Sequence, residues 1–209
     1  MGFPIANYTR LRPYAFHLTA RANLPVLKHS RQLDTAAAIL AQASRPDLLK
    51  ERRTEATTVP VNGRDVLLRD QSPLHSGNIC FDDGWTLETL VEELNHRVFF
   101  WPGTAKGPSD YGRRHFERYK DERPIVLRIC TVDLLSHNPE LQPQFCPFNS
   151  GAPRTTGGKK SPRGRKLFLP ADRFERRASA VVELTFRGSV TLPHSTEWAD
   201  SYSSTWQPL

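Results

Sequence analysis

The apolar residues of this chain fall into short runs separated by turn-forming residues, and this spacing constrains the fold more than any other feature. The runs with the aromatic or β-branched character of β-strands are Tyr14–Thr19, Arg97–Trp101, Ile125–Val132 and Ala180–Phe186. Seventeen prolines and twelve glycines favour loops and short elements between these runs. We therefore expect a sheet of short strands rather than a helical bundle.

Helical segments of uneven length separate these strands. In Asp34–Ser44 an Asp suited to capping a helix precedes an alanine-rich stretch, and Trp85–Asn95 carries apolar residues at helical spacing. Ala20–Leu27 resembles a shorter helix with Thr19 as its N-cap. Asp110–Lys120 is expected to form a basic, aromatic helix.

The arrangement of these elements predicts the fold class. Val59–Leu68 contains Asn62-Gly63, a strong hairpin signal between two apolar stretches. Because regular βαβ alternation is missing, the pattern predicts an α+β fold with mostly antiparallel sheets. The sequence contains neither a GxGxxG nor a Walker-type loop, so a dinucleotide site would have to be of another kind.

The length of 209 residues fits a single domain, with a core over about residues 10–193 and a polar, peripheral tail over 194–209. The charged segment Leu48–Thr57 is expected to be an exposed helix or loop. No apolar stretch approaches the roughly 18 residues needed to span a bilayer, and no signal peptide is visible. We therefore expect no membrane partner.

The net charge limits the expected binding partners of the protein, and the cysteines indicate its cellular compartment. The formal net charge of +7 favours polyanionic partners such as nucleic acid. Cys80, Cys130 and Cys146 are odd in number and widely spaced, which predicts reduced thiols and a cytoplasmic location rather than disulfides or a zinc site. The histidines do not cluster with paired carboxylates at ligand spacing, so no metal is expected.

The candidates for chemistry are His17 in the first strand, the run Phe99–Trp101 in a middle strand and Glu183 in a late strand. Each also has a purely structural interpretation. A histidine on an apolar strand is often a hydrogen-bonded core residue, and an aromatic run is normally core. Glu183 has apolar neighbours and could point outward by strand alternation. Taken singly, these residues leave both interpretations open.

Three segments together resemble the DarT-like branch of the ADP-ribosyltransferases. Tyr14-Ala-Phe-His-Leu-Thr-Ala-Arg-Ala-Asn-Leu24 resembles the opening of that family, His-x-Thr followed by Asn-Leu. Leu94–Trp101 resembles its second strand, and Ala180–Phe186, with Val190 and Pro193 downstream, resembles the strand that carries its catalytic glutamate. Each motif is short and degenerate, and the specificity lies in their order over most of the chain.

The resemblance implies an ADP-ribosyltransferase-like fold, with two small, mostly antiparallel sheets flanked by helices around an NAD cleft. It implies transfer of ADP-ribose from NAD, used as a substrate without a metal, to a base of single-stranded DNA or RNA. By the same resemblance the protein would be a bacterial toxin or phage-defence effector with a neutralising antitoxin or hydrolase partner. The alternatives are a protein-directed transferase, an NAD glycohydrolase and a non-catalytic nucleic-acid-binding module.

The resemblance also assigns roles to residues of the NAD cleft. Glu183 would be catalytic: it would hydrogen-bond a ribose hydroxyl and stabilise the cationic sugar. His17 would fix NAD by a hydrogen bond, and either Phe100 or Trp101 would stack on the nicotinamide ring. The family carries Tyr-Phe where this chain has Phe100-Trp101, which puts one hydroxyl contact in doubt.

Other residues are predicted to bind NAD or the acceptor. Thr19 and Asn23 belong to the opening motif and are assigned to NAD, whereas Arg69 would either pair with its pyrophosphate or lie in a solvated turn. The acceptor would contact the loop before the glutamate strand, at residues that a solvated loop would equally expose: Asn149, Arg154, Lys159, Lys160, Arg163 and Arg165. A second basic cluster, Arg113–Lys120, lies on the helix expected at Asp110–Lys120.

Overall fold

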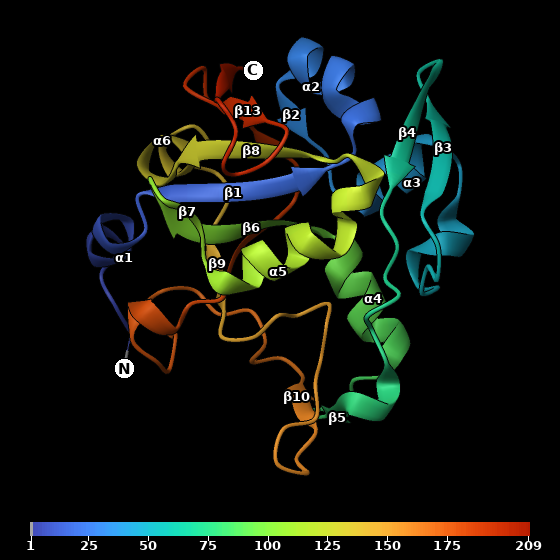
Figure 1. Ribbon diagram of the computed structural model, residues 1–209. Coiled ribbons are helices and arrows are strands. Elements are labelled where there is room, and N and C mark those ends of the chain that lie inside the picture. Colours follow the sequence, from blue (N-terminus) through green and yellow to red (C-terminus); the bar gives the residue numbers. More distant parts are fainter. Residues whose placement is uncertain (1) are drawn as a thin grey trace.

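The computed structural model describes residues 2–209 and is organised around one antiparallel sheet with the strand order β14-β13-β8-β1-β6-β11-β9, in which β7 also pairs with β6 (Figure 1). The strands of this sheet are β1 (Tyr14–Thr19), β6 (Arg97–Thr104), β7 (Gly107–Pro108), β8 (Ile125–Cys130), β9 (Gln144–Cys146), β11 (Glu183–Arg187), β13 (Glu197–Ala199) and β14 (Gln207–Pro208). The expected α+β class with antiparallel sheets is confirmed.

Small sheets and short helices surround the main sheet. Three two-stranded sheets are formed by β2 (Gln32–Leu33) with β12 (Val190–Thr191), β3 (Thr57–Val61) with β4 (Arg64–Leu68), and β5 (Ile79–Phe81) with β10 (Ser161–Arg163). The helices are α1 (Ile5–Leu11), α2 (Leu24–Ser30), α3 (Ala36–Gln42), α4 (Leu87–Asn95), α5 (Asp110–Tyr119) and α6 (Thr131–Ser136). No helix within residues 2–209 is long and apolar enough to cross a membrane.

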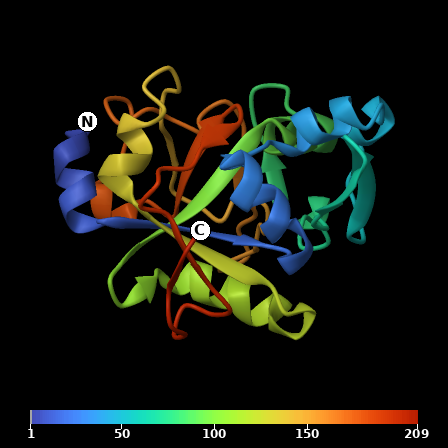
Figure 2. The same cartoon turned by 90° about the horizontal axis from the view of Figure 1, so that it is seen from above.

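Strand alternation divides the core between the two faces of the sheet. Phe16, Trp101 and Val126 pack on one face with Phe116 of α5. The opposite face holds the larger cluster, which includes Phe100 and residues of β8 and α6. Figure 2 shows α5 and α6 on opposite sides of the sheet. Successive residues of β6 therefore face different surroundings.

The sheet splits between β1 and β6. Strand β1 pairs with β6 only over Tyr14–Phe16, which lie opposite Trp101–Gly103. It pairs with β8 along its whole length, to Thr19. The first half of β6 pairs with β11 on its other side instead. In place of the two small sheets that we expected, the structure therefore has one main sheet whose halves are joined by three residue pairs.

Local signals predicted several elements well. Tyr14–Thr19 forms β1 with the expected bounds, and the Asn62-Gly63 hairpin joins β3 to β4. Asn62 and Gly63 have φ of 50° and 75°, the positive values that a type I′ turn requires at both central positions. The helices expected near residues 34–44, 85–95 and 110–120 form α3, α4 and α5.

Caps and strand ends differ from expectation. Thr19 ends β1 instead of capping a helix, because Arg21–Asn23 forms a 3-10 turn before α2. The cap of α3 is Thr35, whose hydroxyl accepts from the Ala38 amide at 3.1 Å, one residue after the expected Asp34. Strand β8 ends at Cys130 because α6 begins at the next residue, and β11 begins only at Glu183, after a 3-10 turn.

The core extends beyond residues 10–193 at both ends, which corrects the predicted boundaries. Residues 194–209 were expected to be peripheral, but β13 pairs with β8 and β14 with β13. Trp198 of β13 is only 8% exposed and packs in the larger core cluster. At the other end, Phe3 and Tyr8 pack against Phe145 with ring centroids 5.0 and 4.9 Å apart.

Gly112 sets how closely α5 approaches the sheet. A Cβ at this position would lie 2.8 Å from side-chain atoms of both Pro108 and Trp101. Gly112→Ala is therefore expected to lower the free energy of unfolding by about 1–3 kcal/mol, measured by urea denaturation. Gly77→Ala is the control, because its Cβ would meet nothing within 4 Å. Equal effects of the two substitutions would contradict the close-packing argument.

Candidate functional site

A cavity of about 770 Å³ lies where β1 separates from β6. Its walls come from the end of β1, the first half of β6, the β3–β4 hairpin, one face of α5 and the loop 149–152. Figure 1 shows the hairpin standing beside the end of β1 and the start of β6. The volume lies within the range of small-molecule sites. His17, Trp101 and Glu183, which are far apart in the sequence, all line this cavity.

His17 spans the split in the sheet. Its Nδ1 lies 2.8 Å from the carbonyl oxygen of Phe99. Because a carbonyl can only accept, Nδ1 carries the hydrogen, and Nε2 of the neutral ring is left as an acceptor. Burial, aided by the positive charge of Arg69, lowers the pKa of His17. The imidazole is therefore neutral near pH 7 and offers the cavity a lone pair.

Glu183 faces inward, which excludes the alternative that it points to solvent. It is 2% exposed and lines the cavity from the first position of β11. The Ser150 amide lies 3.2 Å from both carboxyl oxygens. Burial raises the pKa of Glu183 to about 7, against the opposing effects of Ser150 and Arg163. Near pH 7 the carboxyl group therefore exists in both protonation states.

Strand alternation separates the two aromatic residues predicted to stack on a ligand. Trp101 lines the cavity, as does Phe99 two positions earlier. Phe100 is fully buried on the other face of the sheet, with its ring centroid 6.0 Å from that of Phe186. The prediction that Phe100 contacts a ligand is therefore wrong, and Trp101 remains.

The N-terminal residues assigned to NAD line the cavity, but Asn23 has little capacity left for a ligand. Its Nδ2 donates to Leu67 O and Thr19 Oγ1 at 3.2 and 3.1 Å, and its Oδ1 accepts from Leu67 N at 3.2 Å. Both amide hydrogens are thus used. Asn23 fastens the β3–β4 hairpin to β1, and Thr19 supports it.

Arg69 lines the cavity, and helix α5 supplies neighbours that the sequence did not single out. The Arg69 guanidinium lies 4.1 Å from the ring centroid of Tyr119 and pairs with Glu122 at 2.7 Å. Its Nη2 is buried and has no hydrogen-bond partner among residues 2–209. A buried guanidinium with an unused N–H donor is suited to binding an anionic group.

His115 was also missed, although helical spacing could have revealed it. Gly112, His115 and Tyr119 recur at intervals of three and four residues, so they share one face of α5. Gly112 packs on Trp101, and the other two residues line the cavity. Burial, followed by the charge of Arg69, lowers the pKa of His115 to about 3, which keeps it neutral.

Arg53 is a buried cation that the sequence placed in an exposed segment. It is 8% exposed and lines the cavity. It donates to Arg69 O at 3.2 Å and to Asn95 Oδ1 at 3.0 Å. Within the described part of the chain it forms no ion pair with a carboxylate. No sequence signal distinguishes it from the neighbouring Arg52.

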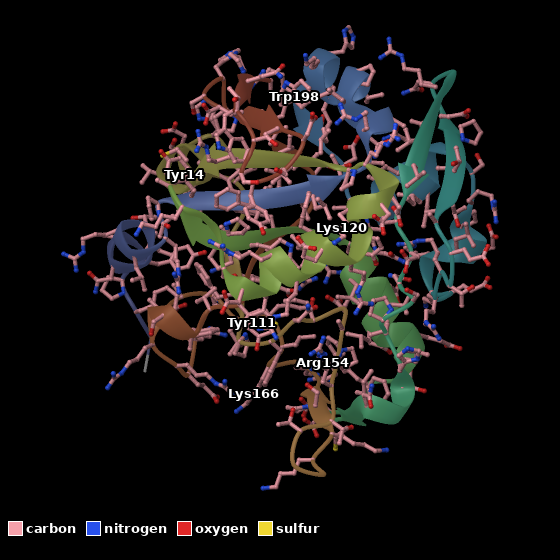
Figure 3. All side chains as sticks on the ribbon, in the orientation of Figure 1. Tyr14, Tyr111, Lys120, Arg154, Lys166 and Trp198 are labelled. Atoms are coloured by element: carbon pink, nitrogen blue, oxygen red, sulfur yellow. The ribbon has the colours of Figure 1, made fainter. Side chains whose placement is uncertain are left out.

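The residues predicted to contact an acceptor fall into three groups. Asn149 lines the cavity. The side chains that are exposed and lie outside its lining are Arg154, Lys159, Lys160 and Arg165. Figure 3 shows Arg154 and Lys166 in the lower part of the molecule, below Tyr111 of α5. The cavity and the exposed basic loop are thus separate features joined at residues 149–152.

Arg163 forms the third group, and its predicted exposure is wrong. The residue is 1% exposed. Its guanidinium is bonded to backbone oxygens of Asn149, Ser150 and Pro162 and to the Ser161 hydroxyl. Four of its five N–H groups are engaged because the loop folds back around it, so it cannot reach a phosphate backbone.

The chain belongs to the family of unknown function DUF7002, whose sequence model matches residues 13–195. This range contains every residue that lines the cavity. Comparison with curated proteins and with solved structures found no match.

Glu183 should make stability depend on pH. Its pKa of about 7 in the folded protein exceeds the ordinary 4.5, so folding loses stability as pH rises between these values. Glu183→Gln removes this titration. We expect the variant to match the wild type near pH 4 and to be more stable by about 3 kcal/mol at pH 8, measured by urea unfolding.

The control for this measurement is Glu140→Gln, which replaces an exposed glutamate. It should show no stability gain that grows with pH. A Glu183→Gln difference that stays constant from pH 4 to pH 8 would contradict a raised pKa at Glu183.

Proposed function

We propose that this member of the DUF7002 family is an NAD-dependent mono-ADP-ribosyltransferase that modifies a base of single-stranded DNA or RNA. The observation that carries the proposal is the convergence of His17, Trp101 and the buried Glu183 on one cavity. A sheet that splits between β1 and β6 supports an ADP-ribosyltransferase-like fold, which we infer together with the function.

The cavity offers chemically suitable groups for each part of NAD. Arg53 and Arg69 place positive charge where a pyrophosphate could bind. Trp101 presents an aromatic surface for the nicotinamide ring. His17 Nε2 can accept a hydrogen bond from a ribose hydroxyl or from the nicotinamide amide. These roles leave Glu183 for the reacting ribose.

Transfer breaks the bond between ribose C1′ and the nicotinamide nitrogen, and the bonding electron pair leaves with neutral nicotinamide. Positive charge develops on the ribose, and the Glu183 carboxylate stabilises it. The lone pair of an acceptor atom then forms the new bond to C1′, and the acceptor's proton passes to Glu183 or to water. Only the ionised form of Glu183 can perform these steps, and its pKa of about 7 makes that form available near neutral pH.

The exposed basic loop supports a nucleic acid as the acceptor. The exposed cations that follow Asn149, which itself lines the cavity, include Arg154, Lys159, Lys160 and Arg165. They could hold a phosphate backbone while one base reaches the cavity. A single strand suits this arrangement, because its bases need not be pulled out of a duplex. Such a modification of nucleic acid would be toxic to a cell unless a partner neutralised or reversed it.

Incubation with labelled NAD and separate pools of single-stranded DNA, RNA and protein tests the proposal. We expect label on one nucleic-acid pool, a rate that rises through pH 7 as Glu183 ionises, and a loss of at least about 100-fold in Glu183→Gln. The exposed variant Glu140→Gln should keep the full rate.

The other outcomes of this experiment identify the alternatives. Label on protein would indicate a protein-directed transferase, and nicotinamide release without transfer to any pool would indicate a glycohydrolase. Nucleic-acid binding with neither label nor nicotinamide release would favour a binding module without catalysis.

The double substitution Lys159→Ala, Lys160→Ala should weaken acceptor binding through charge alone. For single strands each phosphate contact contributes about 0.7 to the slope of log affinity against log salt, so the slope should fall by about 1.4. Nicotinamide release without acceptor should not change, because neither lysine lines the cavity. The control Lys50→Ala replaces a lysine paired with Glu92 outside the loop and should leave the slope unaltered.

A further inference from the structure

We propose that Arg163 is a positioning residue that holds the Ser150 amide against the Glu183 carboxyl group. The sequence had placed Arg163 with the exposed cations of the basic loop. In the structure it lies beneath that loop, in β10, and connects the loop to the carboxyl group at the start of β11. The effect of Arg163 on the protonation of Glu183 does not depend on the proposed function, whereas its consequence for transfer rests on that function.

The guanidinium of Arg163 is hydrogen-bonded to backbone carbonyl oxygens of the loop. Nε donates to Ser150 O at 3.2 Å and Nη2 to Asn149 O at 2.8 Å. Nη1 donates to Ser161 Oγ at 2.7 Å and to Pro162 O at 2.8 Å. The bond to Asn149 O holds the peptide group whose N–H, that of Ser150, donates to both oxygens of Glu183. The bond to Ser150 O holds the next peptide group. Arg163 therefore fixes the direction in which that amide points.

The burial of Arg163 needs an explanation beyond loop structure. At 1% exposure it is a buried cation whose hydrogen-bond partners within residues 2–209 are all neutral oxygens. Burying a charge without a counter-charge costs several kcal/mol. Ionised Glu183 supplies that counter-charge, because the two groups interact electrostatically across Ser150. Arg163 therefore offsets part of the cost that burial imposes on the ionised form of Glu183.

The other groups around Glu183 do not replace Arg163 in this role. Cys146 lies opposite Glu183 in the β9–β11 pairing, and burial raises the pKa of its thiol well above the usual value, so the thiol stays neutral. Burial raises the pKa of Glu183, and Ser150, the Arg163 charge and a hydrogen bond with Cys146 lower it, in that order of size. Of these groups only Arg163 carries a charge. Without Arg163 the charge is lost and the amide is no longer held in place.

The first test measures the pKa of the Glu183 carboxyl group and needs no assay of activity. The stability gained by Glu183→Gln grows with pH until the folded carboxyl ionises and then levels off. The pH at which this gain levels off, which we call the levelling pH, therefore reports the pKa of Glu183. We expect this pH to be about one unit or more higher in an Arg163→Met background than in the wild-type background. An unchanged levelling pH would overturn the proposal.

The second test uses nicotinamide release from NAD. If the pKa of Glu183 rises by one unit from about 7, the ionised fraction at pH 7 falls about fivefold, and most of it returns by pH 9. We expect kcat of Arg163→Met to follow this profile with KM for NAD little changed. An equal loss of kcat at every pH would show general structural damage and overturn the positioning role.

Matched variants keep the result interpretable. Arg10→Met removes the same charge from an exposed site on α1 and should change neither the levelling pH nor kcat. If Arg163→Met fails to fold, Arg163→Lys retains the charge but lacks the guanidinium that bonds both loop carbonyls. Its levelling pH should still rise, and an unmoved value would overturn the proposal. If the wild type releases no nicotinamide, the proposed function fails while the stability measurement still decides the role of Arg163.

Discussion

The hydrogen bond from His17 Nδ1 to the Phe99 carbonyl spans the place where β1 leaves β6. At this point the first half of β6 has lost β1 as a neighbour, and backbone groups buried there would lack partners. The His17 side chain satisfies one of them and holds the two strands at a fixed separation. Strand β8 on one side and β11 on the other keep both halves of the sheet intact. The cavity can therefore lie within the main sheet.

Buried charged side chains determine which ligands this cavity favours. Glu183, Arg53 and Arg163 are each at most 8% exposed. In such surroundings one added or removed charge has a larger effect than at the surface, because the local dielectric response is weak. His17 and His115 stay neutral for the same reason, near the cation Arg69. A ligand that brings negative charge would therefore be favoured near Arg53 and Arg69, and one that develops positive charge near Glu183.

Sequence reasoning located most elements and singled out His17, Trp101 and Glu183, which line the candidate cavity, and its errors have physical causes. Strand and hairpin signals are local, so β1 and the β3–β4 turn were predictable. Phe100 was misplaced because an unbroken aromatic run does not reveal which alternate residues face a cavity. Arg163 was misplaced because an arginine among glycines and lysines looks the same whether it meets solvent or its own loop. The cavity residues Arg53 and His115 depend on long-range packing, which no short motif records.

The wide separation of the cavity's parts along the chain has a consequence for biosynthesis. A ribosome releases His17 early, but Glu183 emerges only after β6 and β8 have been made, and β13 must follow before the outer side of β8 is covered. The nascent chain therefore carries an incomplete site for most of its translation. An enzyme of the proposed kind would become active only after nearly all of this domain had left the exit tunnel.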